Sequence, residues 1–197
     1  MIFFVRHGQT DWNAEHRLQA WSDIPLNEIG RRQAAAIRDL LSARDVRFAR
    51  AATSPLQRAV ETAEIILAEQ TVTAPAYDAL REVGLGDYEG RLEEALRTEL
   101  GERYQQWRAT LFAEPAPGGE TRQIAANRVG PIIAELAEAA RHDDVLIVGH
   151  QAINMVMKSV LAGTDDLETL RGFMQANHQI DMWDIATQSI AERLAVD

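Results

Sequence analysis

Short, almost continuously apolar runs alternate along this chain with longer segments in which apolar residues recur every three or four positions. The apolar runs predict four β-strands, at about residues 2–5, 49–53, 145–149 and 180–185. Runs of this kind are typical of parallel strands that are buried on both faces of a sheet. The spaced pattern predicts amphipathic helices at about residues 27–44, 56–69 and 121–141.

A more strongly charged segment, residues 92–112, also has helical spacing. Its stripe consists of Leu96, Leu100, Tyr104, Trp107 and Leu111. Such a stripe is more often a packing surface than a cofactor site. The proline and glycine residues at 115–119 predict an ordered loop after this helix. Because the 197 residues show no repeat or linker, the pattern predicts one α/β domain over residues 1–197.

Composition excludes several classes of function. The formal net charge of −10 opposes binding to nucleic acid or to an anionic membrane surface. The chain has no cysteine, which excludes disulfides, thiol catalysis and zinc–thiolate sites. Arg6 interrupts the first apolar run too early for a signal peptide, and no later run is long enough to cross a membrane. We therefore expect a cytoplasmic protein with no membrane partner.

Two of the predicted strands lead directly into histidines. The first is followed by Arg6-His7-Gly8-Gln9-Thr10, and the run at 145–149 is followed by His150. Ligands of open α/β sheets bind outside the carboxyl ends of the strands, so these positions suit a small anionic substrate. Taken alone, a histidine at a strand end is more often structural than catalytic.

Two further segments carry charges that fit the same chemistry. Ser54-Pro55 is a good helix-opening pair, which places Arg58 in the first helical turn, where backbone amides and the helix dipole favour an anion. Glu82 lies in the glycine-punctuated loop of residues 80–90. By themselves, Arg58 and Glu82 also fit solvated surface charges.

In this order along the chain, the four segments resemble the histidine phosphatase superfamily, which includes cofactor-dependent phosphoglycerate mutases and many small-molecule phosphatases. The resemblance extends to about Gly163 and includes Trp12-Asn13 and the segments at 17–34 and 117–121. It implies a three-layer sandwich, in which helices flank a mostly parallel central sheet. It also implies a small helical cap, built from an insert at about residues 85–120, over the mouth of the site.

The resemblance implies a role for each candidate residue. His7 is the expected nucleophile, which forms a phosphohistidine, and Glu82 is the expected proton donor and acceptor. Arg6, Arg58 and His150 are expected to surround the phosphoryl oxygens. The further residues expected to bind substrate are Asn13, Thr10, Gln19, Gln151 and Arg108.

The other histidines are not expected to take part in the chemistry. His16, His142 and His178 lack the spacing of metal ligands and are interpreted as surface or structural residues. The sequence therefore predicts no metal and no cofactor. A small phosphorylated metabolite is the expected partner, and a homodimer is compatible with the sequence.

Two residues depart from the family pattern, since Ala20 and Gln151 stand where glycine is usual. Three functions remain open: a phosphomonoester hydrolase, a phosphoglycerate mutase and a non-catalytic phosphate-binding protein. Mutases of the family carry a lysine after the glutamate motif and an arginine pair after a tryptophan. Here Glu93 stands at the position of the lysine, and Ala109 stands at the position of one arginine of the pair. Both differences favour hydrolysis over mutase activity.

Overall fold

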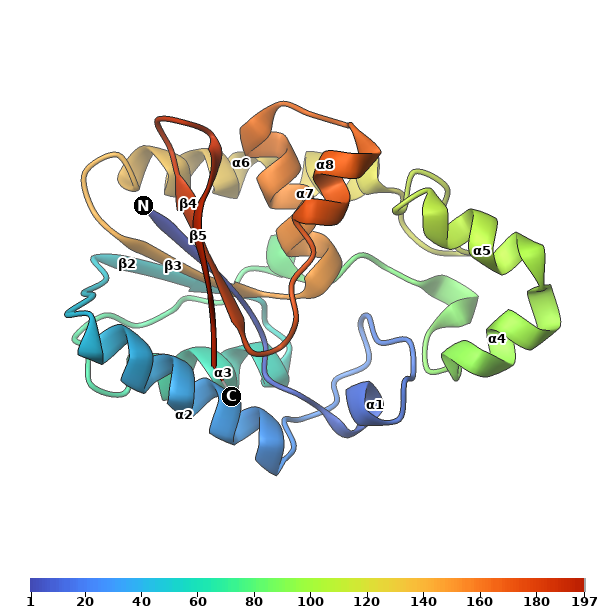
Figure 1. The fold of residues 1–197 in the computed structure, drawn as a ribbon, viewed down its shortest axis with the longest axis horizontal. Helices are drawn as coiled ribbons and strands as arrows, with labels where there is room; N and C mark the ends of the chain where they lie inside the picture. Colours follow the sequence, from blue (N-terminus) through green and yellow to red (C-terminus); the bar gives the residue numbers. More distant parts are fainter. Residues whose placement is uncertain (197) are drawn as a thin grey trace.

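The computed structural model describes residues 1–196, which form a mixed five-stranded sheet between two layers of helices (Figure 1). The sheet has the order β2-β3-β1-β4-β5, in which β1 and β2 both pair in parallel with β3, and β4 runs antiparallel to β1 and β5. The strands are β1 (Ile2–Arg6), β2 (Arg50–Thr53), β3 (Val145–Gly149), β4 (Gln179–Asp184) and β5 (Ser189–Ala195). The predicted α/β sandwich is confirmed, with β4 as the one reversed strand among the five.

Each face of the sheet has its own apolar core. Successive side chains of a strand point to opposite faces. Phe3 and Val5 of β1 accordingly pack with α2 (Glu28–Ala43) and α3 (Gln57–Leu67). Ile2 and Phe4 pack on the other face, which is covered by α6 (Arg122–Ala139) and α7 (Gln151–Ala162). Figure 1 shows these pairs of helices below and above the sheet.

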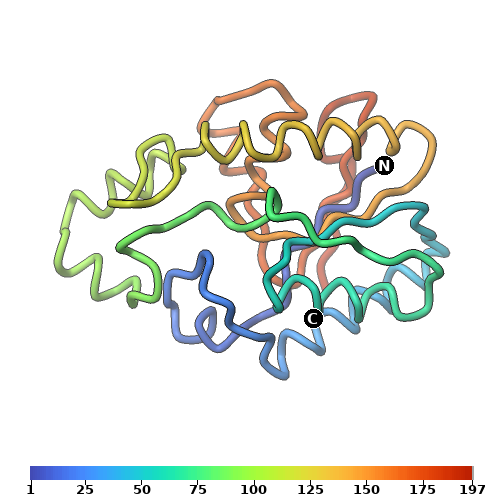
Figure 2. Tube along the Cα trace, turned by 180° about the vertical axis from the view of Figure 1, so that it is seen from behind, coloured from blue at the N-terminus to red at the C-terminus, as the bar shows by residue number. Residues whose placement is uncertain are grey.

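The predicted cap extends from the sandwich as a separate lobe, seen in green in Figure 2. It contains two helices, α4 (Glu93–Leu100) and α5 (Glu102–Ala109), so the prediction of one continuous helix was wrong. The chain turns at Gly101, which has a φ of 55° that glycine adopts without a steric penalty. The interpretation of the apolar stripe as a packing surface fits the structure, because Leu96, Tyr104 and Trp107 form a small core of the cap.

Several elements were not anticipated from the sequence. They are the short helices α1 (Asp11–Ala14) and α8 (Leu167–Gly172), the 3-10 turns η1 (Asp78–Leu80) and η2 (Gly86–Tyr88), helix α7 and strand β5. Strand β5 lies at the sheet edge and is mostly exposed, so its sequence lacks the apolar run of a buried strand. Among the helices of residues 1–196, none is long and apolar enough to cross a membrane.

The three parallel strands end at the same edge of the sheet. The register pairs Arg6 with Gly149 and Thr53 with Val148. His7, Ser54 and His150 directly follow these strand ends, and the backbone amide of His7 donates to the carbonyl of Gly149 over 3.0 Å. The register therefore brings together residues that are far apart in the sequence.

Candidate active site

His7 is buried at the end of β1, with one ring nitrogen fixed by the backbone. Its Nδ1 lies 2.7 Å from the carbonyl oxygen of Gly8. Since a carbonyl only accepts, Nδ1 carries the proton and the lone pair of neutral histidine is on Nε2. Burial, together with the charges of Arg58 and Arg6, lowers the pKa of His7 well below 6.5. The ring is therefore neutral at neutral pH and is prepared to act as a nucleophile.

The carbonyl of Gly8 is itself held in place by close backbone packing. A Cβ atom on Gly8 would lie 2.4 Å from the carbonyl oxygen of Gly30, in the first turn of α2. Only glycine permits this approach. The amide of Gly8 also donates to Oγ1 of Thr62 over 3.1 Å. Gly8 thus fixes the acceptor that orients the His7 ring.

His150 lies against His7 with no exposed surface. The two ring centroids are 5.0 Å apart, and Nε2 of His150 is 2.7 Å from Oγ of Ser54. Burial lowers the pKa of His150 well below 6.5, and the charge of Arg58 adds to this effect. Both imidazoles are consequently neutral in the folded protein near pH 7.

Two guanidinium groups, of the buried Arg58 and the half-buried Arg6, lie beside the histidines and are held by carbonyl oxygens. Arg58 donates to the carbonyls of Ser22 over 2.8 Å and Ala20 over 2.6 Å, and Arg6 donates to the carbonyl of Gln175 over 3.1 Å. Within residues 1–196, neither arginine forms an ion pair with a carboxylate. Burial lowers the pKa of each to about 10, so both stay charged at neutral pH. No ion pair therefore cancels the positive charge that these two groups place beside His7.

Glu82 provides the carboxyl group of the site, fixed by three backbone amides. Its Oε1 accepts from the amides of Val83 (2.8 Å) and Ile153 (2.9 Å), and its Oε2 accepts from the amide of Ala152 (3.1 Å). Ala152 and Ile153 belong to the first turn of α7. Desolvation by burial raises the pKa of Glu82 above its usual value of 4.5 and outweighs the lowering effect of these amides. With a raised pKa, the carboxyl group of Glu82 can hold a proton and release it to a bound molecule.

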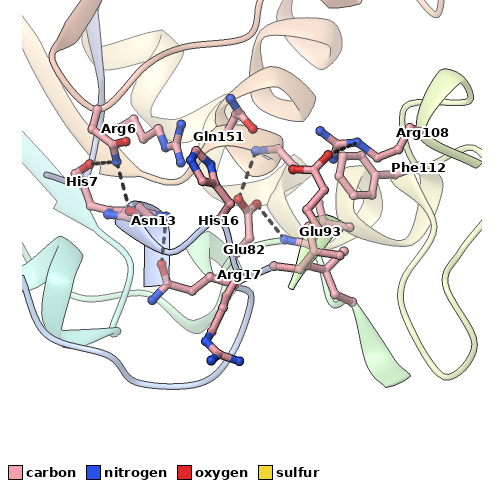
Figure 3. Close-up of a pocket in the computed structure, with 16 residues that line it drawn as sticks. Arg6, His7, Asn13, His16, Arg17, Glu82, Glu93, Arg108, Phe112 and Gln151 are labelled. Atoms are coloured by element: carbon pink, nitrogen blue, oxygen red, sulfur yellow. Dashed lines mark hydrogen bonds and ion pairs between the residues drawn. The ribbon is translucent and has the colours of Figure 1, made fainter. Parts of the chain in front are cut away.

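Arg6, His7 and Glu82 meet at a cavity of about 330 Å³ under the cap (Figure 3). Seven of the predicted site residues line it: Arg6, His7, Asn13, Gln19, Glu82, Arg108 and Gln151. In Figure 3, Arg6, His7 and Asn13 lie on one side, and Glu93, Arg108 and Phe112 lie on the opposite side. The cavity thus has a polar end at the sheet and a second end formed by the cap.

Three predicted site residues do not line the cavity. Arg58 and His150 have no exposed surface, and of the two the ring of His150 packs against His7. Thr10 is also fully buried and acts as the N-cap of α1, where its Oγ1 accepts from the amide of Asn13 (3.2 Å) and donates to Oε1 of Gln19 (3.0 Å). In this structure Thr10 is placed to orient Asn13 and Gln19 rather than to touch a ligand.

A model of the histidine phosphatase superfamily (branch 1) matches residues 2–195. The chain belongs to this superfamily. The resemblance seen in the sequence is therefore confirmed, and with it the assignment of the protein to a superfamily of phosphoryl-transfer enzymes.

Relatives within the superfamily carry names of two kinds. The chain is 38% identical to a 2,3-bisphosphoglycerate-dependent phosphoglycerate mutase of Cytophaga hutchinsonii, over 76% of this chain and 71% of that protein. It is 32% identical to an uncharacterized phosphatase of Bacillus subtilis, PhoE, over 86% and 82%. Sequence similarity alone therefore does not separate a phosphatase from a mutase.

The solved structures similar to this chain also include both phosphatases and a mutase. A mycobacterial glucosyl-3-phosphoglycerate phosphatase in complex with VO3 superposes with a TM-score of 0.80, at 27% identity over 92% of both chains. A phosphoglycerate mutase from Thermus thermophilus gives a TM-score of 0.74, at 27% identity over 100% of this chain and 99% of the other. The fold is common to both activities, so the cavity lining has to distinguish them.

Several cavity residues were not anticipated as members of this superfamily site. His16, interpreted as a surface or structural histidine, lines the cavity, as do Arg17 and Asn177. The side-chain amide of Asn177 donates to the carbonyl of His7 over 2.7 Å. No pattern in the sequence marks Asn177, because it lies in an irregular segment before β4 and reaches the site only through the fold. No group of three or more histidine or acidic residues within 1–196 is arranged to hold a metal ion.

Arg128 is a further residue that the sequence did not indicate. From α6 it donates to the carbonyls of Ala79 (2.6 Å), Arg81 (3.0 Å) and Glu82 (3.3 Å), and it pairs with Glu120 at 2.8 Å. One largely buried guanidinium therefore ties together the loop that carries Glu82. Arg128 is a positioning residue, and a lone arginine on a helix carries no sequence signal for such a role.

Proposed function

We propose that this superfamily member is a phosphomonoester hydrolase that works through a phosphohistidine on His7. In the first step, Nε2 of His7 attacks phosphorus, the ester P–O bond breaks, and Glu82 gives its proton to the departing alkoxide. In the second step, Glu82 takes a proton from water, which attacks phosphorus and breaks the P–N bond. Inorganic phosphate leaves, and His7 and protonated Glu82 are regenerated.

The observation that carries this proposal is the pairing of a neutral His7 with Glu82 across one cavity. The proton on Nδ1 is fixed by Gly8, which directs the lone pair of Nε2 away from the backbone. Arg6 and Arg58 supply unpaired positive charge for the phosphoryl oxygens, where negative charge spreads in the transition state. A binding protein needs neither a tautomer-controlled nucleophile nor a buried acid.

The two departures from the family pattern do not disturb this arrangement. Ala20 is fully buried, and its carbonyl is the acceptor for Arg58. The side chain of Gln151 donates to the carbonyl of Gln175 over 3.2 Å, which also accepts from Arg6. The arginines therefore keep their backbone acceptors despite both departures, so neither departure favours the alternative of a non-catalytic phosphate-binding protein.

The cap end of the cavity favours hydrolysis over mutase activity. Glu93 lines the cavity, and its Oε1 accepts from the hydroxyl of Tyr104 over 2.9 Å. A cation that also lines the cavity there, Arg108, has its Nε 3.9 Å from this carboxylate. Ala109 adds no charge. A mutase must retain a carboxylated, phosphorylated intermediate, and Glu93 repels such an anion.

The test compares two assays on the same protein. One measures phosphate release from a panel of small phosphate esters, and the other measures phosphoglycerate interconversion with a bisphosphoglycerate primer. We expect hydrolysis to be the faster reaction. Mutase turnover that exceeds hydrolysis would contradict the proposal.

A charge reversal sharpens the same test. Glu93→Lys should improve the KM for phosphoglycerates by roughly tenfold, since a nearby unit charge in a partly desolvated site contributes about 1–4 kcal/mol. Glu94→Lys is the matched control, because Glu94 is the adjacent residue, largely exposed, and does not line the cavity. Equal effects of the two substitutions would show that Glu93 has no specific role in selecting the substrate.

A further inference from the structure

A second, smaller hollow adjoins the catalytic cavity on the cap side. Its volume is about 60 Å³, and we call it the annex. The annex is lined by Trp107, Arg108, Leu111, Phe112 and Met174. Arg108 and Phe112 also line the catalytic cavity, so these two side chains form the partition between the two spaces. Phe112 is the apolar part of this partition.

The turn that presents Phe112 is strained. Leu111 and Phe112 are consecutive non-glycine residues with φ values of 47° and 66°. Such left-handed conformations are unfavourable for residues with a Cβ atom and persist only where the surroundings impose them. Strain of this kind concentrates at sites where the position of a side chain matters for function.

Arg122 imposes the conformation of this turn. Its backbone amide donates to the carbonyl of Phe112 over 2.6 Å, and its guanidinium donates to the carbonyls of Leu111 (3.0 Å) and Thr110 (3.3 Å). The Phe112 ring is also held edge-on against Trp107, with ring centroids 6.2 Å apart. The ring is thus fixed both through its backbone and by its aromatic neighbour.

The lining near Phe112 defines what kind of group fits there. Leu18 and Leu85 belong to the small core of the cap and line the cavity together with Phe112. Two charged side chains also lie at this end, since Glu93 and Arg108 stand beside Phe112 in Figure 3, with Nε of Arg108 3.9 Å from Oε1 of Glu93. The volume of about 330 Å³ is at the low end of the range for ligand sites, so the cavity suits a small ligand.

From this geometry we propose that Phe112 sets the length limit of the leaving group, and that the substrate is a phosphomonoester with a short leaving group. The inference rests on the proposed function, because it assigns the cap end of the cavity to the leaving group. Removal of the ring joins the cavity to the annex, so the site then accepts a longer chain. Phe112 is a specificity-determining residue and takes no part in the chemistry.

The experiment measures kcat/KM for straight-chain alkyl phosphates from propyl to octyl. These esters share nearly the same leaving-group acidity, so differences among them report fit rather than chemistry. We expect the wild type to show a short optimum and at least a tenfold fall at octyl. In Phe112→Ala, kcat/KM should continue to rise by roughly fourfold per added methylene over the next two, the equivalent of about 0.8 kcal/mol each.

Two further variants distinguish a length limit set by Phe112 from a general loss of structure in the cap. Leu111→Ala enlarges the annex but leaves the partition in place, and should keep the chain-length profile of the wild type. Phe112→Leu keeps an apolar wall and should shift the limit less than Phe112→Ala. Thermal unfolding of each variant shows whether the cap remains folded. A uniform drop in Phe112→Ala over all chain lengths, or an equal shift in Leu111→Ala, overturns the inference.

Binding of alkylphosphonates, measured by calorimetry, distinguishes this inference from the proposed function. These analogues are not hydrolysed, so their affinities report fit even in a protein without phosphatase activity. A chain-length limit that Phe112→Ala relaxes, in a protein that releases no phosphate, contradicts the proposed function alone. Ester hydrolysis with identical profiles in wild type and Phe112→Ala contradicts the role of Phe112 alone.

Discussion

Two groups of buried charges in this protein are built on opposite plans. At the active site, the cations of Arg6 and Arg58 bind neutral carbonyl oxygens, and the carboxyl of Glu82 binds backbone amides. Between α7 and the edge of the sheet, the carboxylate of Asp181 contacts both Lys158 and Arg193 directly. Lys158 and Asp181 have no exposed surface, just like Arg58.

The type of partner distinguishes the charged groups of the active site from the ion pairs that stabilise the fold. Lys158 also donates to the carbonyl of Phe173 over 2.6 Å and lies near the rings of Phe4 and Phe173. Its partners are thus all supplied by the fold. Arg58 binds only carbonyl oxygens and forms no ion pair among residues 1–196, so its positive charge is not cancelled by a contact and acts on His7. Burial alone therefore does not identify a functional charge, whereas the type of partner does.

The largest effect is expected for the nucleophile of the active-site group. His7→Ala should lower turnover by roughly 10⁴-fold or more, because no other residue then forms the covalent intermediate. The fold should remain intact, since His7 lies at a strand end. Turnover, acid-labile phosphoryl labelling and thermal unfolding check these points. More than trace activity in His7→Ala would contradict the covalent mechanism.

Removal of the acid should affect substrates unequally. Glu82→Gln should slow alkyl phosphates by roughly 10²–10⁴-fold, since their leaving alkoxide needs a proton. Aryl phosphates should be affected far less, because their leaving groups are stable as anions. The ratio of the two rates is the measurement, and equal losses on both substrates would remove Glu82 from the acid role.

The structural group should respond in stability and not in chemistry. Asp181→Asn leaves Lys158 buried without its counter-ion and should lower the free energy of unfolding by about 3–5 kcal/mol. Activity per folded molecule should stay near the wild-type value. Burial already lowers the pKa of Lys158 to about 8 from 10.5, so neutral lysine is accessible at alkaline pH. The stability loss should therefore shrink as pH rises, and denaturant unfolding at several pH values tests this.

Arg58 should give the opposite result to Asp181. Arg58→Met should reduce kcat/KM by about 1.5–3 kcal/mol of transition-state stabilisation, roughly 10- to 150-fold, and should change unfolding much less than Asp181→Asn does. Arg31→Met is the control for loss of an arginine, since Arg31 forms an exposed ion pair with Glu61 on α3. If Arg58→Met destabilises the fold as strongly as Asp181→Asn, the distinction between the two groups is wrong.

The smallest effect is expected in the pH dependence of kcat/KM. The pKa of His7 lies well below 6.5, so the acidic limb of kcat/KM should also lie below pH 6.5. The pKa of Glu82 is raised above 4.5, and activity should fall as pH rises through it, because the acid is then ionised. Glu82→Gln should remove the alkaline limb. A limb that persists in this variant belongs to another group.

The pH dependence of stability provides an independent check on the histidines. For His7 and His150, the folded pKa is lowered, so the unfolded chain binds more protons as pH falls below 6.5. Their contribution to stability is therefore complete above pH 6.5 and is lost as pH falls toward the folded pKa values.

The fold class, the family and the two histidines at strand ends could all be predicted from the sequence. These follow from local order along the chain, since apolar runs mark buried strands and each run is continuous with the residue that follows it. Gly8 and Ser54-Pro55 were equally visible, because turns and helix starts depend on neighbouring residues. The sequence could not separate one cap helix from two, because Gly101 is tolerated within a helix and only its backbone conformation breaks it.

Which charges form ion pairs and which do not depends on tertiary packing. Lys158 and Asp181 are 23 residues apart, Arg128 reaches the Glu82 loop from 46 residues away, and Asn177 contacts His7 over a separation of 170 residues. The same holds for the partition at Arg108 and Phe112, which exists because these two side chains line both hollows. Contacts between distant segments depend on how the helices and strands pack together, and a local pattern of apolar and polar residues does not encode that packing directly.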